Sequence, residues 1–179
     1  MRALLPMVLG AVLAFSASGV RADEEKIALD KLPKAVLETA KKRFPKAELI
    51  EAAKETDGDK VEYEITLKDG EAKYDVMFSA DGTITLIEKT IAAKDLPKVV
   101  ADAVAEKFPK STGKVYEEMT KIVDGKEVLA YYEVLLETAD KKMFEVEISP
   151  EGKILKTEEK KEEKKEDKKD KKEDKKDKK

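Results

Sequence analysis

The sequence predicts an α+β protein built from two tandem αββββ units, each a helix packed on an antiparallel sheet, followed by a disordered charged C-terminal tail. Three observations support this prediction. A stretch with helical spacing occurs twice, each copy is followed by alternating segments separated by Gly-containing turns, and the last 22 residues are only Lys, Glu and Asp. Internal repetition on this scale sets the architecture, so it is considered before single motifs.

The repeated helical stretch spans Leu32–Lys46 and Leu96–Lys110, reading LPKAVLETAKKRFPK and LPKVVADAVAEKFPK. Apolar residues recur every four positions, which gives one buried stripe of a helix. In the two copies these residues are Leu32, Val36, Ala40 and Phe44, and Leu96, Val100, Val104 and Phe108. Each stretch ends at Phe-Pro, because proline disfavours the α conformation of the residue before it.

Strand candidates follow each helix. In the first copy they span 47–53, 61–67, 73–79 and 83–88, and in the second copy 114–123, 128–137 and 143–149. The segment 61–67 alternates apolar and polar residues, as a strand with one buried face does. Asp-Gly and Glu-Gly pairs between the segments are typical of tight turns in an antiparallel meander.

These elements place the first unit at residues 29–91 and the second at 92–157. Each unit is close to the size at which a domain without disulfides is only marginally stable, so we expect the two to share an interface and unfold together. Residues 23–28 are short and charged, and are predicted to be a disordered lead-in. The tail, 158–179, places like charges four residues apart and has nothing apolar to bury, which favours a disordered polyampholyte over a helical rod.

The N-terminal residues 1–22 resemble a secretory signal peptide. A basic start at Arg2 precedes an apolar run over residues 3–15, and small residues favour cleavage after Ala22. The alternative is an uncleaved anchor, but the apolar run is short of the about 20 residues that span a membrane. We therefore expect a protein that is periplasmic or secreted and not inserted in a membrane.

The composition argues against an enzyme. The chain has no histidine and no cysteine, which excludes a His-assisted nucleophile, a thiolate and the usual zinc sites. No cofactor or metal site is predicted, since the Asp-Gly pairs lack the ligand spacing of a calcium loop. Acidic residues outnumber basic ones, 40 to 37, and Arg43 is the single arginine after residue 22, so nucleic-acid binding is not expected either.

One strand face differs between the two copies. When Tyr63 is matched with Tyr132, the polar face of the first copy becomes apolar in the second. Lys60, Glu62, Thr66 and Lys73 are replaced by Leu129, Tyr131, Leu135 and Met143. A contiguous exposed apolar patch usually marks an interaction site, so we predict that these four residues form the centre of a binding surface. The alternative is that the face is covered by the first unit, by Ile154 and Leu155, or by a second copy in a homodimer.

The order of these motifs resembles a known family. A Leu-Pro-opened helix ending at Phe-Pro, a Tyr-Glu-Ile or Tyr-Glu-Val strand (63–65 and 132–134), an aromatic-Val strand and a final acidic-Gly turn are similar to the PepSY-like module. That module is grouped with beta-lactamase inhibitory protein. The resemblance covers residues 29–156 in two copies. It implies exported bacterial proteins with helices on one face of an antiparallel sheet, and binding or inhibition instead of catalysis.

Together these observations predict an exported, non-enzymatic, inhibitor-like protein that docks a protein or peptide partner through an exposed sheet face. The alternative is a structural envelope protein whose acidic domain and charged tail interact loosely with cations or wall polymer. Ionic strength distinguishes the two, because loose charge-driven association is screened by salt and apolar docking is not.

Overall fold

The structure is a computed structural model that describes residues 23–160. The predicted signal peptide and residues 161–179 of the predicted tail lie outside the described residues. Two α-helices, α1 (Lys34–Arg43) and α2 (Lys98–Lys107), are each preceded by a short 3-10 turn, η1 (Leu29–Lys31) and η2 (Ala93–Asp95). The strands are β1 (Asp23–Ile27), β2 (Glu48–Asp57), β3 (Lys60–Asp69), β4 (Ala72–Ser79), β5 (Ile84–Thr90), β6 (Thr112–Val123), β7 (Lys126–Glu137), β8 (Met143–Ile148) and β9 (Ile154–Lys160).

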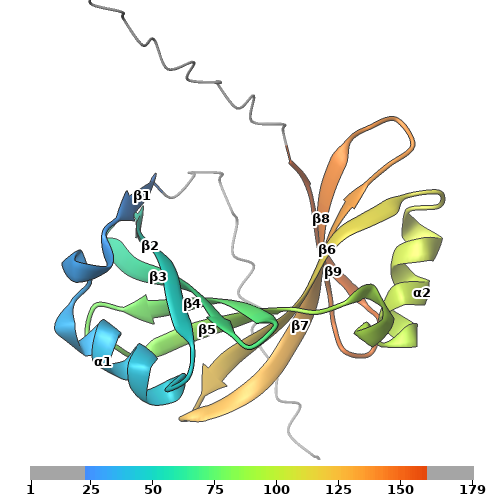
Figure 1. Cartoon of the computed structure of the whole chain (residues 1–179). Helices are drawn as coiled ribbons and strands as arrows, with labels where there is room; N and C mark the ends of the chain where they lie inside the picture. The colour runs from blue at the N-terminus through green and yellow to red at the C-terminus, as the bar shows by residue number, and fades with distance from the viewer. Residues whose placement is uncertain (1–22, 161–179) are drawn as a thin grey trace, which may run out of the picture.

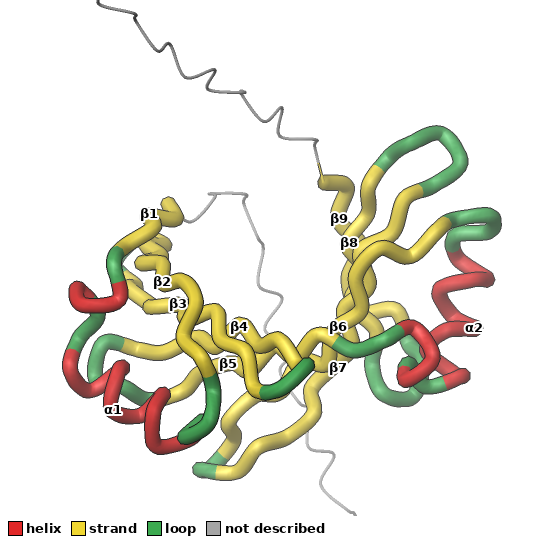
Figure 2. Tube along the Cα trace, viewed as in Figure 1, coloured by secondary structure: helices red, strands yellow, loops and turns green. Residues whose placement is uncertain are grey.

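The nine strands form one antiparallel sheet in the order of the sequence, β1 to β9. The first half of the molecule is β1–β5 with α1, and the second half is β6–β9 with α2. β5 pairs with β6 over five residues, so the sheet continues from one half into the other. The sheet is curved, and both helices lie on its outer, convex side (Figures 1 and 2). No helix within residues 23–160 is long and apolar enough to cross a membrane.

Each helix covers its own apolar core. Under α1, Val36 and Ala40 are fully buried and pack with Ile65, Val76 and Phe78 of the sheet. Under α2, Val100 packs with buried residues of β7 and β8, namely Tyr132, Val134, Leu136, Val146 and Ile148. The apolar stripes and the inward-facing strand residues predicted from the sequence are therefore the residues that fill the two cores. Both helices end where Phe-Pro was expected to end them, at the C-caps Phe44 and Phe108.

The structure corrects two boundaries. Residues 23–27 form the edge strand β1 and not a disordered lead-in, because their backbone pairs with β2 and Ile27 packs against the first core. At the other end, Glu158–Lys160 belong to strand β9 and not to the tail. Their charged side chains are compatible with a strand, because the Lys160 ammonium forms an ion pair with the Glu145 carboxylate of β8, with 2.6 Å between Nζ and Oε2. Sequence patterning missed both segments because the exposed face of an edge strand tolerates charged residues.

Two glycine turns bring the sheet against the helices. Gly82, between β4 and β5, has φ +86°, and a Cβ added there would lie 2.7 Å from the backbone carbonyl of Ala35 in α1. Gly152, between β8 and β9, has φ +85° and approaches Val99 of α2 equally closely. Glycine is required at these turns for its positive φ and for the close approach of the helix.

We expect residues 23–179 to unfold in a single calorimetric transition. The β5–β6 pairing is continuous, and Arg43 at the end of α1 makes a bidentate ion pair with Glu127 of β7 at 2.8 and 3.0 Å. These contacts couple the stabilities of the two halves. Two well-separated transitions in differential scanning calorimetry would show that the halves fold independently.

The role of Gly82 can be isolated by a matched pair of substitutions. Gly82→Ala and Gly70→Ala both place a side chain at positive φ, but a Cβ at Gly70 would meet nothing within 4 Å. Gly70→Ala should lower the free energy of unfolding by about 1 kcal/mol, the cost of the left-handed conformation. Gly82→Ala should lower it by about 2–3 kcal/mol, because the backbone of α1 must also move. Equal losses in urea denaturation would contradict the close-approach argument.

Candidate functional site: the concave face of the sheet

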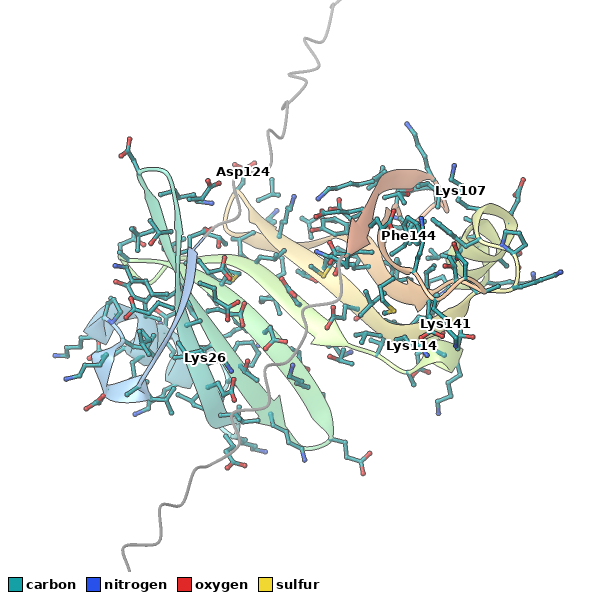
Figure 3. All side chains as sticks on the ribbon, turned by 90° about the horizontal axis from the view of Figure 1, so that it is seen from above. Lys26, Lys107, Lys114, Asp124, Lys141 and Phe144 are labelled. Carbon is teal, nitrogen blue, oxygen red and sulfur yellow. The ribbon has the colours of Figure 1, made fainter. Side chains whose placement is uncertain are left out.

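The sheet face opposite the helices, called the concave face here, is covered by no described element. Figure 3 looks onto it, with Lys26 of β1 toward one side. The cross-strand register shows which side chains share this face, because residues directly opposite each other on paired strands point to the same side. One row runs from Lys26 through Ala53, Glu64, Met77, Leu86 and Lys121 to Val128.

A band of carboxylates crosses the concave face. Asp75 of β4 lies directly opposite Glu88 of β5, and Glu133 of β7 lies directly opposite both Glu117 of β6 and Glu147 of β8. These five residues are called the carboxylate band. Like charges directly opposite each other on paired strands are destabilising, so the arrangement is costly for the free protein.

The structure places the cations at the flanks of this band and not at its centre. Lys73 Nζ lies 2.9 Å from Asp75, and Lys156 Nζ lies 3.7 Å from Glu147. Within residues 23–160, no lysine or arginine forms an ion pair with the three central carboxylates, Glu88, Glu117 and Glu133. Glu117 accepts a hydrogen bond from the Thr90 hydroxyl at 3.3 Å, which supplies no charge.

Burial and the charges of neighbouring carboxylates raise the pKa values of several acidic groups on this face. Burial, followed by the charges of Glu117 and Glu133, raises the pKa of Glu88 to about 8. Burial raises the pKa of Glu133 to about 7, with Glu145 as the next contributor. The pKa of Glu64, beside the band on β3, is also raised to about 7, by burial and then by Asp75. Both causes disfavour the charged form.

Apolar side chains lie between the carboxylates. Met119 is 2% exposed between Glu88 and Tyr131, and Met77 is 8% exposed opposite Leu86. Tyr131, Leu135 and Met143 are partly exposed on the same face of β7 and β8. The Lys121 ammonium lies 5.4 Å from the centre of the Tyr131 ring, within the range of a cation–π contact. Partly exposed apolar groups therefore lie beside carboxylates that form no ion pair within residues 23–160.

Three of the four residues predicted for the patch share the concave face, but Leu129 does not. A β-bulge in β7 places Met119 opposite Tyr131 and Thr120 opposite Leu129, so Ala130 is an extra residue and the alternation reverses. Leu129 therefore points to the convex side, together with Thr120 and Ile87. It is 38% exposed there. The sequence prediction assumed that every second residue from Tyr131 shares one face of the strand, and the bulge breaks that alternation.

Sequence reasoning missed the carboxylate band and the two methionines. Acidic residues are so numerous in this chain that no single one stood out, and only the register shows which of them lie opposite each other. The signal for Met77 was present in the alternation Lys73, Asp75, Met77 of a single strand. Within residues 23–160 no group of three or more His, Cys, Asp or Glu side chains is arranged so that it could hold a metal ion.

Glu88→Gln should stabilise the protein at alkaline pH. Because folding raises the pKa of Glu88, the folded state binds more protons than the unfolded state between about pH 5 and pH 8, and this residue's contribution to stability falls as pH rises through that range. At about pH 8.5 the substitution should raise the free energy of unfolding by on the order of 1 kcal/mol, and at about pH 5 by much less. Urea denaturation at the two pH values measures the difference.

The matched control for this prediction is Glu106→Gln on the exposed surface of α2, which should change the free energy of unfolding by less than about 0.5 kcal/mol. A Glu88→Gln variant that is less stable than the wild type at about pH 8.5 would contradict the repulsion argument.

Solved structures share this fold. A "BLIP-like protein" from Bacteroides fragilis NCTC 9343 matches with a TM-score of 0.55 and 18% identity over 72% of this chain and 86% of that one. A protein described among "putative periplasmic proteins" from Bacteroides eggerthii DSM 20697 matches with a TM-score of 0.60, 15% identity and coverages of 72% and 88%. A DUF2874 family protein from Bacteroides ovatus ATCC 8483 matches with a TM-score of 0.57 and 18% identity over 73% of this chain and 89% of that one. At these identities the likeness concerns the fold alone.

Two family models also match the sequence. The model described as "Peptidase propeptide and YPEB domain" covers residues 27–80. The model described as "Putative beta-lactamase-inhibitor-like, PepSY-like" covers residues 61–156, more than half of the chain. No curated protein sequence matches. The chain therefore belongs to the PepSY-like, beta-lactamase-inhibitor-like family.

Proposed function

We propose that this protein is an exported, non-enzymatic, inhibitor-like binding protein whose concave face docks a basic segment of a protein or peptide partner. One observation carries the proposal: among residues 23–160, no lysine or arginine forms an ion pair with the three central carboxylates of the band, which lie beside partly exposed apolar side chains on an uncovered face. Such a face is costly for the free protein and is relieved by a partner of complementary charge.

The chemistry of the partner follows from the geometry of the face. A lysine or arginine side chain placed over Glu88, Glu117 and Glu133 would favour their ionised forms and gain charge-assisted hydrogen bonds. Apolar groups on either side of that cation would cover Leu135 and the ring of Tyr131, and aromatic residues are frequent anchors at interfaces. Binding would act by occlusion, in that the partner's segment is covered by the curved sheet and withheld from other molecules.

Two further parts of the proposal concern the chain as a whole. Residues 29–91 and 92–157 are proposed to be tandem PepSY-like units. This is supported by the two helices, which have the same length and begin 64 residues apart in the sequence. Export is supported by the signal-like residues 1–22 and by the description of a structural neighbour as periplasmic. Residues 161–179 are proposed to be a disordered solubilising tail, given their composition.

The test is affinity capture from the host's exported fraction with immobilised residues 23–179 and matched variants. One variant changes Tyr131 to Ser and Leu135 to Thr, a second changes Glu88 and Glu133 to Gln, and the control changes Leu129, on the opposite face, to Ser. The wild type and the Leu129 control should retain the same partner, and both concave-face variants should lose it. Circular dichroism verifies that each bait is folded.

The pH of the capture provides an independent readout. Retention of a basic partner should increase from about pH 6 to about pH 8.5, because Glu64, Glu88 and Glu133 ionise over that range. The increase should be smaller in the variant that lacks Glu88 and Glu133, in which Glu64 remains. Loss of the partner only in the Leu129 control would contradict the proposal.

The envelope-protein alternative predicts a different result. Loose association with cations or wall polymer would give the same mixture on every bait, including the double glutamine variant, and would disappear at about 1 M salt, where the Debye length is about 3 Å. A partner that remains bound at that salt concentration to the wild type, but not to the Tyr131 and Leu135 variant, would exclude this alternative.

A further inference from the structure

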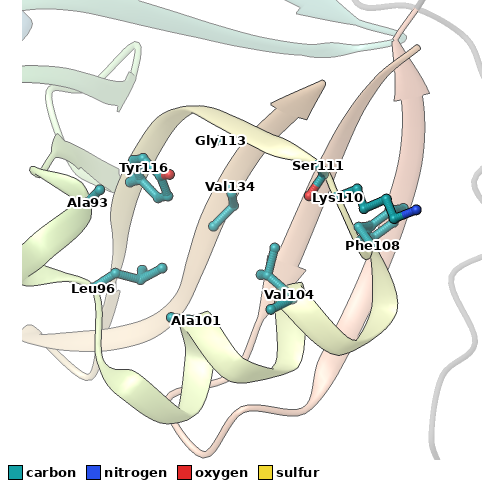
Figure 4. A pocket seen from close by; sticks show the side chains of 11 residues that line it. Ala93, Leu96, Ala101, Val104, Phe108, Lys110, Ser111, Gly113, Tyr116 and Val134 are labelled. Atoms are coloured by element: carbon teal, nitrogen blue, oxygen red, sulfur yellow. The ribbon is translucent and has the colours of Figure 1, made fainter. Parts of the chain in front are cut away.

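A pocket of about 230 Å³ opens on the convex side of the sheet, between α2 and the strands β6 and β7. Its apolar walls come from Leu96, Val104 and Phe108 on the helix side and from Tyr116 and Val134 on the sheet side (Figure 4). It lies on the opposite side of the sheet from the concave face and is therefore separate from the surface proposed to bind a partner.

In the first half, three leucines pack at the place that matches the pocket. The elements around the two helices correspond at a constant spacing of 64 residues, from the 3-10 turns through the helices to the β-bulges at Leu49 and Gly113. At that spacing, Leu29, Leu37 and Leu49, which pack against the first core, are replaced by Ala93, Ala101 and Gly113, which line the pocket.

A tyrosine in β6 replaces part of the side-chain volume that is lost at these three positions. Tyr116 occupies the position that matches Ala52, and its ring lies over Gly113, where an added Cβ would be 2.0 Å from the tyrosine oxygen. Gly113 therefore admits the Tyr116 ring. The exchange replaces three partly buried leucine side chains that pack against the core with one aromatic ring at the wall of the pocket, and the space between the ring and α2 stays open.

Polar groups appear in the second half where the matching positions of the first are apolar. The hydroxyls of Tyr116 and Ser111 are directed toward the pocket (Figure 4), and the matching residues are Ala52 and Ala47. Within the described part of the chain, neither hydroxyl has a hydrogen-bond partner. Lys110 lies at the rim with its ammonium turned outward, and its flexible four-carbon stem gives it reach over the opening.

An apolar pocket with a few convergent polar groups is the usual form of a small-molecule site. An apolar cavity of about 150 Å³ already accommodates benzene, so this one has room for a ring with a short chain. Two hydroxyl donors and a nearby ammonium favour an oxygen-acceptor head group with negative charge. We propose that the pocket binds a small carboxylic acid with an aromatic or short aliphatic body, its apolar part against Ala101 and Val134 and its carboxylate toward Tyr116, Ser111 and Lys110.

The test uses 3-phenylpropionate as the probe, with 3-phenylpropan-1-ol and 3-phenylpropylamine as comparators of similar shape. Residues 23–179 should show saturable shifts in ¹H–¹⁵N spectra, confined to α2 and the start of β6, with the acid bound more tightly than the alcohol and the amine bound least. Tyr116→Phe should lower the affinity for the acid by about three- to tenfold, which is the effect of losing one hydrogen bond. The affinity for the alcohol should change less.

Ala101→Leu restores the leucine of the matching position and should fill the pocket. This substitution should lower the affinity for every probe by at least about tenfold. It should also raise the melting temperature of the unliganded protein, because it fills a cavity. The matched control, Lys107→Ala on the exposed surface of α2, should change neither. The absence of saturable binding by the wild type at about 10 mM probe would overturn the proposal, as would equal affinity for acid and amine or unchanged binding by Ala101→Leu and Tyr116→Phe.

Discussion

The pairing of β5 with β6 is the interaction on which the rest of the structure depends. It joins Leu86–Thr90 to Glu117–Lys121 and so makes one nine-stranded sheet from two helix-covered halves. The curvature of that sheet gives one face to the two helices and leaves the other uncovered. Without this pairing, Glu88 would not lie near Glu117, and the carboxylate band would end at an exposed edge of each half.

The two faces of the sheet are stabilised in opposite ways. The convex face buries large apolar side chains under α1 and α2, with no buried polar or charged residue among those described. The concave face holds carboxylates side by side with their counter-cations at the flanks, which costs stability. Burial, and after it the repulsion between neighbouring carboxylates, raises the pKa values of Glu64, Glu88 and Glu133. The proposed binding role gives a reason for a face that does not favour folding.

Sequence reasoning identified the features that depend on local periodicity. The two helices, their Phe-Pro ends and the inward-facing residues of β3 and β7 follow from spacing within one segment. Its errors have a common cause in contacts across strands. The bulge at Ala130 moved Leu129 to the convex side, and the edge strand β1 formed because β2 provided backbone partners for charged residues. Neither event is encoded in the segment in which it occurs.

The sequence by itself determined the α+β class, the two helices and the strands between them, the absence of histidine and cysteine, and the family resemblance, because each depends on residue type and short-range spacing. The tertiary structure decided which side chains meet. Register sets Asp75 opposite Glu88 and Glu117 opposite Glu133, and the packing of α2 on β6 leaves a pocket where the matching place under α1 is filled. These juxtapositions join residues far apart in the chain, and only the folded backbone fixes their distances.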